Sequence, residues 1–296
     1  MNKLSRNSNY KSIIELNIAS IFVSTSGVLG RYIDLPVLSI IATRSVLAGV
    51  LIFLFCKWRK FDFNIKRKDR LAFFVGGLLM GLHWLSYFYT LKLSSVAVGM
   101  LLIFTYPIIT AFLEPLVLKT KFQRMHLLLG CLVLVGIYFL VPGFVIEEYH
   151  VKVFGMGLFS AFCFSLRNLI MKSQSAAYNG SILMFYQLLI VSVCLVPFLF
   201  TLDNSGFVEQ LPANLLLALL TTAIGHTYYL YSFRKLSTTS VGIISSVQPI
   251  YGIILGIVFL KEYPVVGTLI GGGLILIAVI IESVRTYNKK EIADKQ

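Results

Sequence analysis

The chain has 296 residues, of which 57% are hydrophobic and only 13% are Asp, Glu, Lys or Arg. Soluble domains have about 45–50% apolar and roughly 25% charged residues, and here the mean hydropathy of the whole chain is +0.83. The composition therefore excludes a water-soluble protein and a soluble enzyme with a single apolar anchor. The formal net charge of +13 would suit a nucleic-acid-binding domain only if the charges shared one folded face.

Ten apolar runs are each close to the roughly 20 residues that a helix needs to cross a bilayer. They are continuous rather than alternating, which favours helices over a membrane β-barrel. The first run contains Glu15 and Asn17, so it is interpreted as a retained helix and not as a cleaved signal. The predicted transmembrane helices cover residues 13–32, 36–56, 71–91, 95–118, 125–142, 153–172, 181–202, 211–232, 239–260 and 265–283.

The basic residues lie mostly in the gaps between these runs. If the N-terminus is cytoplasmic, most of the 26 Lys and Arg residues fall on the cytoplasmic side, and the densest group lies at 57–70. Positive residues collect at the cytoplasmic ends of membrane helices, so both termini are predicted to be cytoplasmic. The positive charge is thus interpreted as a topology signal with some affinity for anionic lipid, and no nucleic-acid partner is expected.

The chain also repeats itself, because rare residues recur in the same order in equivalent runs. A shift of 142 or 143 residues matches His83 with His226, Lys92-Leu93-Ser94 with Lys235-Leu236-Ser237, Pro107-Ile108 with Pro249-Ile250, and Gly130 with Gly272. Such coincidences are hard to obtain by chance in an apolar chain. We therefore predict two five-helix copies, residues 1–142 and residues 143–296.

An odd number of spans in each copy means that the second copy enters the membrane from the opposite side. The predicted fold is an all-α polytopic membrane protein of ten transmembrane helices, arranged as two inverted five-helix repeats. Inverted repeats are typical of secondary transporters, whose substrate site lies near the midplane between the repeats.

Two prolines, Pro107 and Pro249, fall near the centres of the fourth and ninth runs. A proline there removes a backbone hydrogen bond, so we predict a break in each helix. The freed carbonyl groups should face protein or a water-filled cavity rather than lipid, although a purely structural kink is the alternative. Polar and aromatic residues near the breaks are Phe104, Thr105, Tyr106, Thr110, Ser245, Ser246, Gln248 and Tyr251.

Two of the histidines inside the spans, His83 and His226, are candidates for the site, because an ionisable residue within the membrane is costly and usually faces the interior. His83 is in the third run and His226 is in the eighth. Each either binds the solute or a proton, or is an interior residue bonded to a neighbouring helix. Tyr87 and Tyr229 follow them closely, and rings with polar tips suit a cavity that holds an organic solute.

Three further ionisable residues within the runs are considered as functional candidates. Arg44, in the second run, is assigned a structural or charge role. Arg167 can reach the cytoplasmic surface along its aliphatic stem or join Asn168 in a site. Glu114 is a candidate either for interfacial solvation or, with the two histidines, for proton coupling. The predicted substrate-binding residues are His83, Tyr87, Tyr106, Pro107, Arg167, Asn168, His226, Tyr229, Gln248, Pro249 and Tyr251.

The tract Lys92-Leu93-Ser94-Ser95-Val96-Ala97-Val98-Gly99, followed by Tyr106-Pro107-Ile108-Ile109 and Leu118-Lys119, resembles an EamA domain of the drug/metabolite transporter superfamily. The second copy has a similar tract, which runs from Lys235-Leu236-Ser237-Thr238 to Leu260-Lys261-Glu262. The resemblance therefore covers nearly the whole chain as two tandem domains.

This resemblance implies ten helices, cytoplasmic termini and a central cavity lined by helices one, three, four, six, eight and nine. It also implies export of amino acids, purines or other metabolites without ATP hydrolysis. One position departs from the family pattern. Glu262 keeps the acidic residue that usually follows the ninth helix, but the matching position in the first copy is Thr120.

The expected function is a secondary transporter that exports a small metabolite such as an amino acid by alternating access around a midplane cavity. Its expected partners are the metabolite and the bilayer, with the chain as a monomer or homodimer in a cell membrane, taken to be a bacterial inner membrane. No cofactor and no enzymatic activity are expected, since the sequence has no Walker A motif and no catalytic motif. A lipid-handling flippase and a polytopic membrane enzyme are the alternatives.

Overall fold

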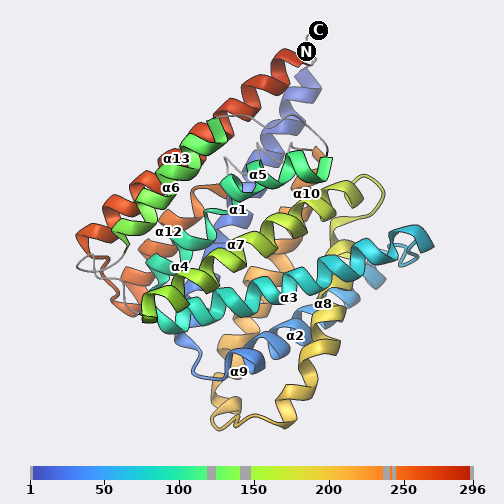
Figure 1. The fold of residues 1–296 in the computed structure, drawn as a ribbon. Coiled ribbons are helices and arrows are strands. Elements are labelled where there is room, and N and C mark those ends of the chain that lie inside the picture. Colours follow the sequence, from blue (N-terminus) through green and yellow to red (C-terminus); the bar gives the residue numbers. More distant parts are fainter. Residues whose placement is uncertain (1–2, 119–124, 141–147, 236–240, 242–244, 294–296) are drawn as a thin grey trace.

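The computed structural model describes residues 3–118, 125–140, 148–235, 241 and 245–293 (Figure 1). Within these ranges every regular element is a helix, which confirms the predicted all-helical class. The predicted domain boundary at 142–143, Lys119, Thr120 and residues 236–238 lie outside the described residues.

The helices follow the predicted apolar runs along the chain. In the first half they are α1 (Lys3–Tyr32), α2 (Val37–Trp58), η1 (Arg67–Asp69), α3 (Arg70–Leu93), α4 (Val96–Ile103), α5 (Tyr106–Leu118) and α6 (Met125–Phe139). In the second half they are α7 (Glu148–Gln174), α8 (Gly180–Leu195), η3 (Val196–Phe200), α9 (Phe207–Leu216), η4 (Leu217–His226), α10 (Thr227–Lys235), α12 (Gln248–Leu255), η5 (Gly256–Leu260) and α13 (Val266–Ala293).

Several helices are long and apolar enough to cross a membrane. Among the described residues there are 6 of them, namely Val37–Trp58, Arg67–Leu93, Val96–Val117, Glu148–Gln174, Gly180–Phe200 and Phe207–Arg234. Shorter apolar helices cover Leu127–Phe139, Gln248–Leu260 and Val266–Ile281. The chain is therefore a multi-pass membrane protein, whereas the number of ten crossings stays a prediction.

The fourth predicted run is broken where the sequence indicated. Helix α4 ends at Ile103, Phe104 and Thr105 form a turn, and α5 begins at Tyr106. Pro107 is then the second residue of α5, a position where its missing N–H breaks no helical hydrogen bond. The predicted break is confirmed.

The second proline has the same local structure. Ser246 and Val247 form a turn, α12 begins at Gln248, and Pro249 is its second residue. These positions match those of the first break under a shift of 142 residues. In the described residues, the turn and the helix start at Pro249 therefore repeat those at Pro107.

The eighth predicted run differs from the single α-helix that we expected. It is divided into α9, the π-helical segment η4 and α10. π-helical turns are rare and are frequently found at functional sites. Here the π-helical segment contains Thr221 and Thr222 and ends at His226.

Helix packing brings distant parts of the chain together. Helix α3 packs along α7, α2 packs against α8, and α1 contacts η4 and α12 (Figure 1). At one edge α6 pairs with α13, and these two helices approach closely through small residues, as is common in membranes. A Cβ atom on Gly136 would lie 2.9 Å from the carbonyl oxygen of Gly271.

This contact leads to a prediction about two neighbouring glycines. A Cβ on Gly271 would collide with the carbonyl oxygen of Gly136, whereas one on Gly273 would meet nothing within 4 Å. We expect Gly271→Ala to destabilise the protein by about 1–3 kcal/mol through overpacking. Gly273→Ala should be neutral or stabilise it by about 0.5–1 kcal/mol, because alanine is the better helix former. Melting temperatures in detergent test this, and equal values for both variants would contradict it.

Candidate functional site

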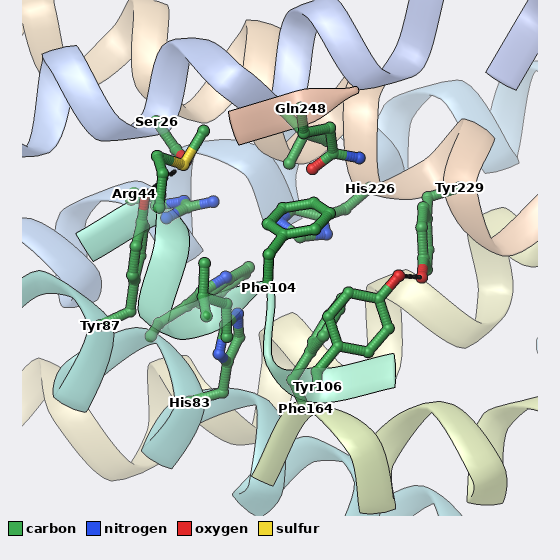
Figure 2. Close-up of a pocket in the computed structure, with 14 residues that line it drawn as sticks. Ser26, Arg44, His83, Tyr87, Phe104, Tyr106, Phe164, His226, Tyr229 and Gln248 are labelled. Carbon is green, nitrogen blue, oxygen red and sulfur yellow. Dashed lines mark hydrogen bonds between the residues drawn. The ribbon is translucent and has the colours of Figure 1, made fainter. Parts of the chain in front are cut away.

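A cavity lies between the two halves of the chain, where the two broken helices begin again (Figure 2). The lining side chains come from both halves and are mainly aromatic with polar tips. They are Val23, Ser26, Arg44, His83, Trp84, Tyr87, Met100, Ile103, Phe104, Tyr106, Phe164, His226, Tyr229 and Gln248. None of these lining residues is acidic.

The cavity is narrow in this conformation. The room that it offers to water-sized molecules is about 40 Å³, and one water needs roughly 10–15 Å³ by this measure. It therefore has space for a few waters, and a metabolite fits only if the surrounding helices or side chains move.

One wall is built around His83 on α3. Its Nδ1 atom lies 2.8 Å from the Ser160 hydroxyl of α7, and that hydroxyl in turn donates to the His83 carbonyl oxygen at 2.9 Å. Since the single hydroxyl proton is used there, Nδ1 is the donor of the first bond, which leaves Nε2 as an acceptor. The His83 ring also packs on Phe164, with centroids 4.6 Å apart. A small polar group of a solute could bond to this histidine.

A second wall is formed by tyrosines from the two halves. The hydroxyls of Tyr106 on α5 and Tyr229 on α10 are 3.2 Å apart, and Figure 2 shows them joined at one side of the cavity. The Tyr106 ring stands edge-on to Phe164, with centroids 5.0 Å apart. Aromatic edges and hydroxyl groups in this arrangement suit an organic solute with both apolar and polar parts.

Arg44 on α2 is buried completely. Its Nε donates to Thr222 Oγ1 at 2.6 Å, and its Nη2 donates to Thr221 Oγ1 at 3.1 Å, both from η4. The guanidinium carbon lies 4.0 Å from the centre of the Trp84 ring. These contacts place a cation at the edge of the cavity.

Gln248 fixes the start of α12 against α1. Its carbonyl oxygen accepts a hydrogen bond from Ser24 Oγ at 3.1 Å, and its side-chain Nε2 lies 3.3 Å from Ser20 Oγ. The first residue of each re-started helix, Tyr106 or Gln248, therefore lines the cavity.

The structure gathers only part of the predicted substrate-binding set. His83, Tyr87, Tyr106, His226, Tyr229 and Gln248 line the cavity, together with Arg44. Five other members of that set, and the proton-coupling candidate Glu114, are not among the lining residues; they are Pro107, Arg167, Asn168, Pro249, Tyr251 and Glu114.

Arg167 does not reach a surface, so the interpretation that it extends to the cytoplasmic face is wrong. It is buried completely on α7. Its Nε donates to Gln187 Oε1 at 2.6 Å, and its Nη1 donates to Asn168 Oδ1 at 3.0 Å. The bonds hold the guanidinium inside the helix bundle, behind the cavity wall that contains Phe164.

Several residues of the site were not predicted from the sequence. Thr221 and Thr222 bond to Arg44, Ser160 bonds to His83, and Phe164 and Ser26 line the cavity. The Thr221-Thr222 pair inside an apolar run was a visible signal. Ser160 and Phe164 are four residues apart and so share a helix face, but that pattern is equally common in ordinary cores.

A larger groove lies on one side of the cavity, between α1, α2, α8, η4 and α10. It offers about 820 Å³ to water-sized molecules. Ala223 and Ile224 of η4 line the groove, while His226 of the same segment lines the cavity. The π-helical segment therefore separates the two spaces.

On the other side the helix ends are tied together. Arg31 Nε forms an ion pair with Glu262 Oε1 at 3.0 Å, and Glu262 Oε2 accepts a hydrogen bond from the backbone N–H of Val96 at 2.9 Å. Arg31 Nη1 also donates to the carbonyl oxygen of Lys92 at 2.7 Å. These bonds connect the ends of α1 and α3, the start of α4 and the segment after η5.

The chain is similar in sequence and in fold to known proteins over most of its length. A family model described as the EamA-like transporter family matches residues 11–141 and again residues 152–284. The pseudopaline exporter CntI of Pseudomonas aeruginosa, in strains UCBPP-PA14 and PAO1, is 25% identical over 252 residues, which cover 83% of this chain and 86% of that protein. A solved crystal structure of a protein has the same fold, with a TM-score of 0.67 at 15% identity over 94% of this chain and 98% of that chain.

Proposed function

This chain belongs to the EamA-like transporter family, and from that premise we propose that it is a secondary transporter that exports a small organic metabolite by alternating access. Membership of this family indicates that the chain is a transporter rather than an enzyme. The observation that carries the finer proposal is the closed, aromatic-lined cavity between the two halves, with a tied face on one side and a wide groove on the other.

Positions that are equivalent in the two halves support an inverted repeat. His83 and His226 both line the cavity, and so do Tyr106 and Gln248, which begin the two re-started helices. Two copies related by an axis in the membrane plane would bring such pairs to one central site. We propose that residues 1–142 and 143–296 are these copies and that together they cross the membrane ten times.

The orientation proposed from the basic loops predicts which face of the protein is cytoplasmic and which is outer. The groove contains Glu15 of α1 and Arg234 near the end of α10, and it would open to the cytoplasm. The Arg31–Glu262 ion pair would close the outer face. The structure would then represent a state that receives solute from the cytoplasm of a bacterial cell through movement of η4.

The solute class is proposed from the cavity walls and from the relative. Tyrosine hydroxyls, a histidine acceptor and aromatic faces suit an amino acid or a similar small amphipathic metabolite. Export is supported by the relative that is named as an exporter. His83, Tyr87, Tyr106, His226, Tyr229 and Gln248 are the proposed contacts with the solute, and His83, His226 and Glu114 are the proposed groups for any proton coupling.

Flux through proteoliposomes tests the proposal. Purified protein in vesicles should move at least one of a panel of amino acids, nucleobases, polyamines and sugars faster than protein-free vesicles do, without ATP. The same vesicles with a fluorescent phospholipid test the flippase alternative. Lipid movement without solute flux would overturn the proposal in favour of that alternative. Solute flux that does not respond to an imposed pH gradient would exclude proton coupling.

A further inference from the structure

The fully buried guanidinium of Arg44 lines the cavity without an anionic partner among the described residues. Within the described part of the chain, Arg44 bonds only to the neutral hydroxyls of Thr221 and Thr222 and lies over the rings of Trp84 and Phe88. A charged residue inside a membrane protein usually pairs with an opposite charge or marks a substrate pathway. Among the side chains that the structure describes, none supplies that charge to Arg44.

The guanidinium presents one unused edge. Nε and Nη2 form one edge of its plane, and the two threonines of η4 occupy that edge. Nη1 is buried and has no hydrogen-bond partner. Together with the second N–H of Nη2 it forms the other edge, whose two parallel donors match the two oxygens of a carboxylate.

Two more unpartnered nitrogen atoms belong to residues that line the same cavity. Trp84 Nε1 and His226 Nδ1 are buried without a hydrogen-bond partner, and the two rings have centroids 5.6 Å apart. An indole nitrogen can only donate, and a histidine nitrogen can donate in one tautomer. All three residues line the same cavity, and Figure 2 shows Arg44 and His226 facing its centre. A cluster of buried donors without acceptors is suited to an anion.

The re-started helices add to this preference. Both α5 and α12 begin at the cavity, and a helix N-terminus carries a partial positive charge that favours anionic groups. The opposite wall, with Phe164, Tyr106 and Tyr229, is aromatic. The two walls differ in chemistry, so the solute should differ between its two ends.

We propose that the transported solute carries a carboxylate and that the free edge of Arg44 binds it, with Trp84 and His226 as further donors. The body of the solute then packs against the aromatic wall. This inference rests on the proposed transport function. It adds that the solute is anionic and that Arg44 recognises its carboxylate.

The test compares each carboxylate with its own primary amide. Probes are L-phenylalanine and L-phenylalaninamide, L-histidine and L-histidinamide, and 3-phenylpropionate and 3-phenylpropionamide, measured by flux and by thermal stabilisation of the wild-type protein. At least one acid should be moved or bound at least tenfold better than its amide. Arg44→Gln should remove most of that preference. Arg44→Lys, which keeps the charge but lacks the fork, should restore only part of it.

A matched control comes from the same helix. Lys57→Gln also removes one positive charge from α2, but Lys57 is exposed and outside the cavity, so the acid preference should persist. Equal responses to acids and amides in the wild-type protein, or an acid preference that survives in Arg44→Gln, would overturn this inference. Flux of neutral or cationic solutes alone would overturn it and leave the transport proposal standing, whereas no flux of any solute would overturn both.

Discussion

Gln187→Leu is expected to destabilise the protein by about 2 kcal/mol, because it removes the 2.6 Å hydrogen bond from the buried guanidinium of Arg167. A charge that loses a partner in a buried site is costly, since no water replaces the lost acceptor. Asn168 Oδ1 would still accept a hydrogen bond from Arg167 Nη1, at 3.0 Å. Thermal unfolding of the purified variant in detergent should show a melting temperature several degrees below that of the wild-type protein.

The double variant Arg167→Met, Gln187→Leu separates an effect on stability from an effect on solute transport. Replacing both members of a buried polar pair by apolar residues of similar size is often neutral or stabilising. The double variant should therefore recover most of the stability that Gln187→Leu loses. It should also keep solute flux if Arg167 is structural. A stable double variant without flux would show that Arg167 belongs to the solute site, as the sequence suggested.

Ser26→Phe is expected to lower solute flux at least tenfold, close to that of protein-free vesicles. Ser26 on α1 lines the cavity, which offers only about 40 Å³ to water-sized molecules. The benzyl side chain has five more heavy atoms than the serine side chain, so it would fill that room. Overpacking should reduce stability by about 1–3 kcal/mol, and size-exclusion chromatography will show whether the variant stays folded.

Ser26→Ala is the matched control, because it removes the hydroxyl without filling the cavity. Its flux should stay within about fivefold of the wild-type value, since a neutral hydrogen bond contributes roughly 1 kcal/mol. A folded Ser26→Phe variant that transports as fast as the wild-type protein would show that the solute passes elsewhere. The groove beside η4 would then be the next space to test.

Much of the fold could be predicted because the signals are local. A continuous apolar run indicates a membrane helix wherever it packs, and a proline breaks a helix through its own missing N–H. Hence the breaks before Pro107 and Pro249 were foreseen, and the structure has both. The π-helical turns of η4 were not foreseen, because the apolar run that contains them predicts a helix but not its number of residues per turn.

The candidate site could be predicted only in part. Inversion predicted that His83 and His226 would occupy equivalent depths, and both line the cavity. The pairing of Arg44 with Thr221 and Thr222 joins residues about 178 positions apart. No local pattern connects such residues, so sequence reasoning could assign Arg44 only a general charge role.

By itself the sequence determined that this is a membrane protein, because 57% hydrophobic and 13% charged residues are compatible only with a membrane environment. It also determined the helices, the two breaks and the resemblance between the two halves. The tertiary structure alone decided which buried polar groups found partners. Arg44 and Arg167 each obtained two oxygen partners, but Nη1 of Arg44 is buried without one. Both are buried arginines in apolar runs, and only the packing of neighbouring helices decides that Arg44 keeps an unused edge at the cavity.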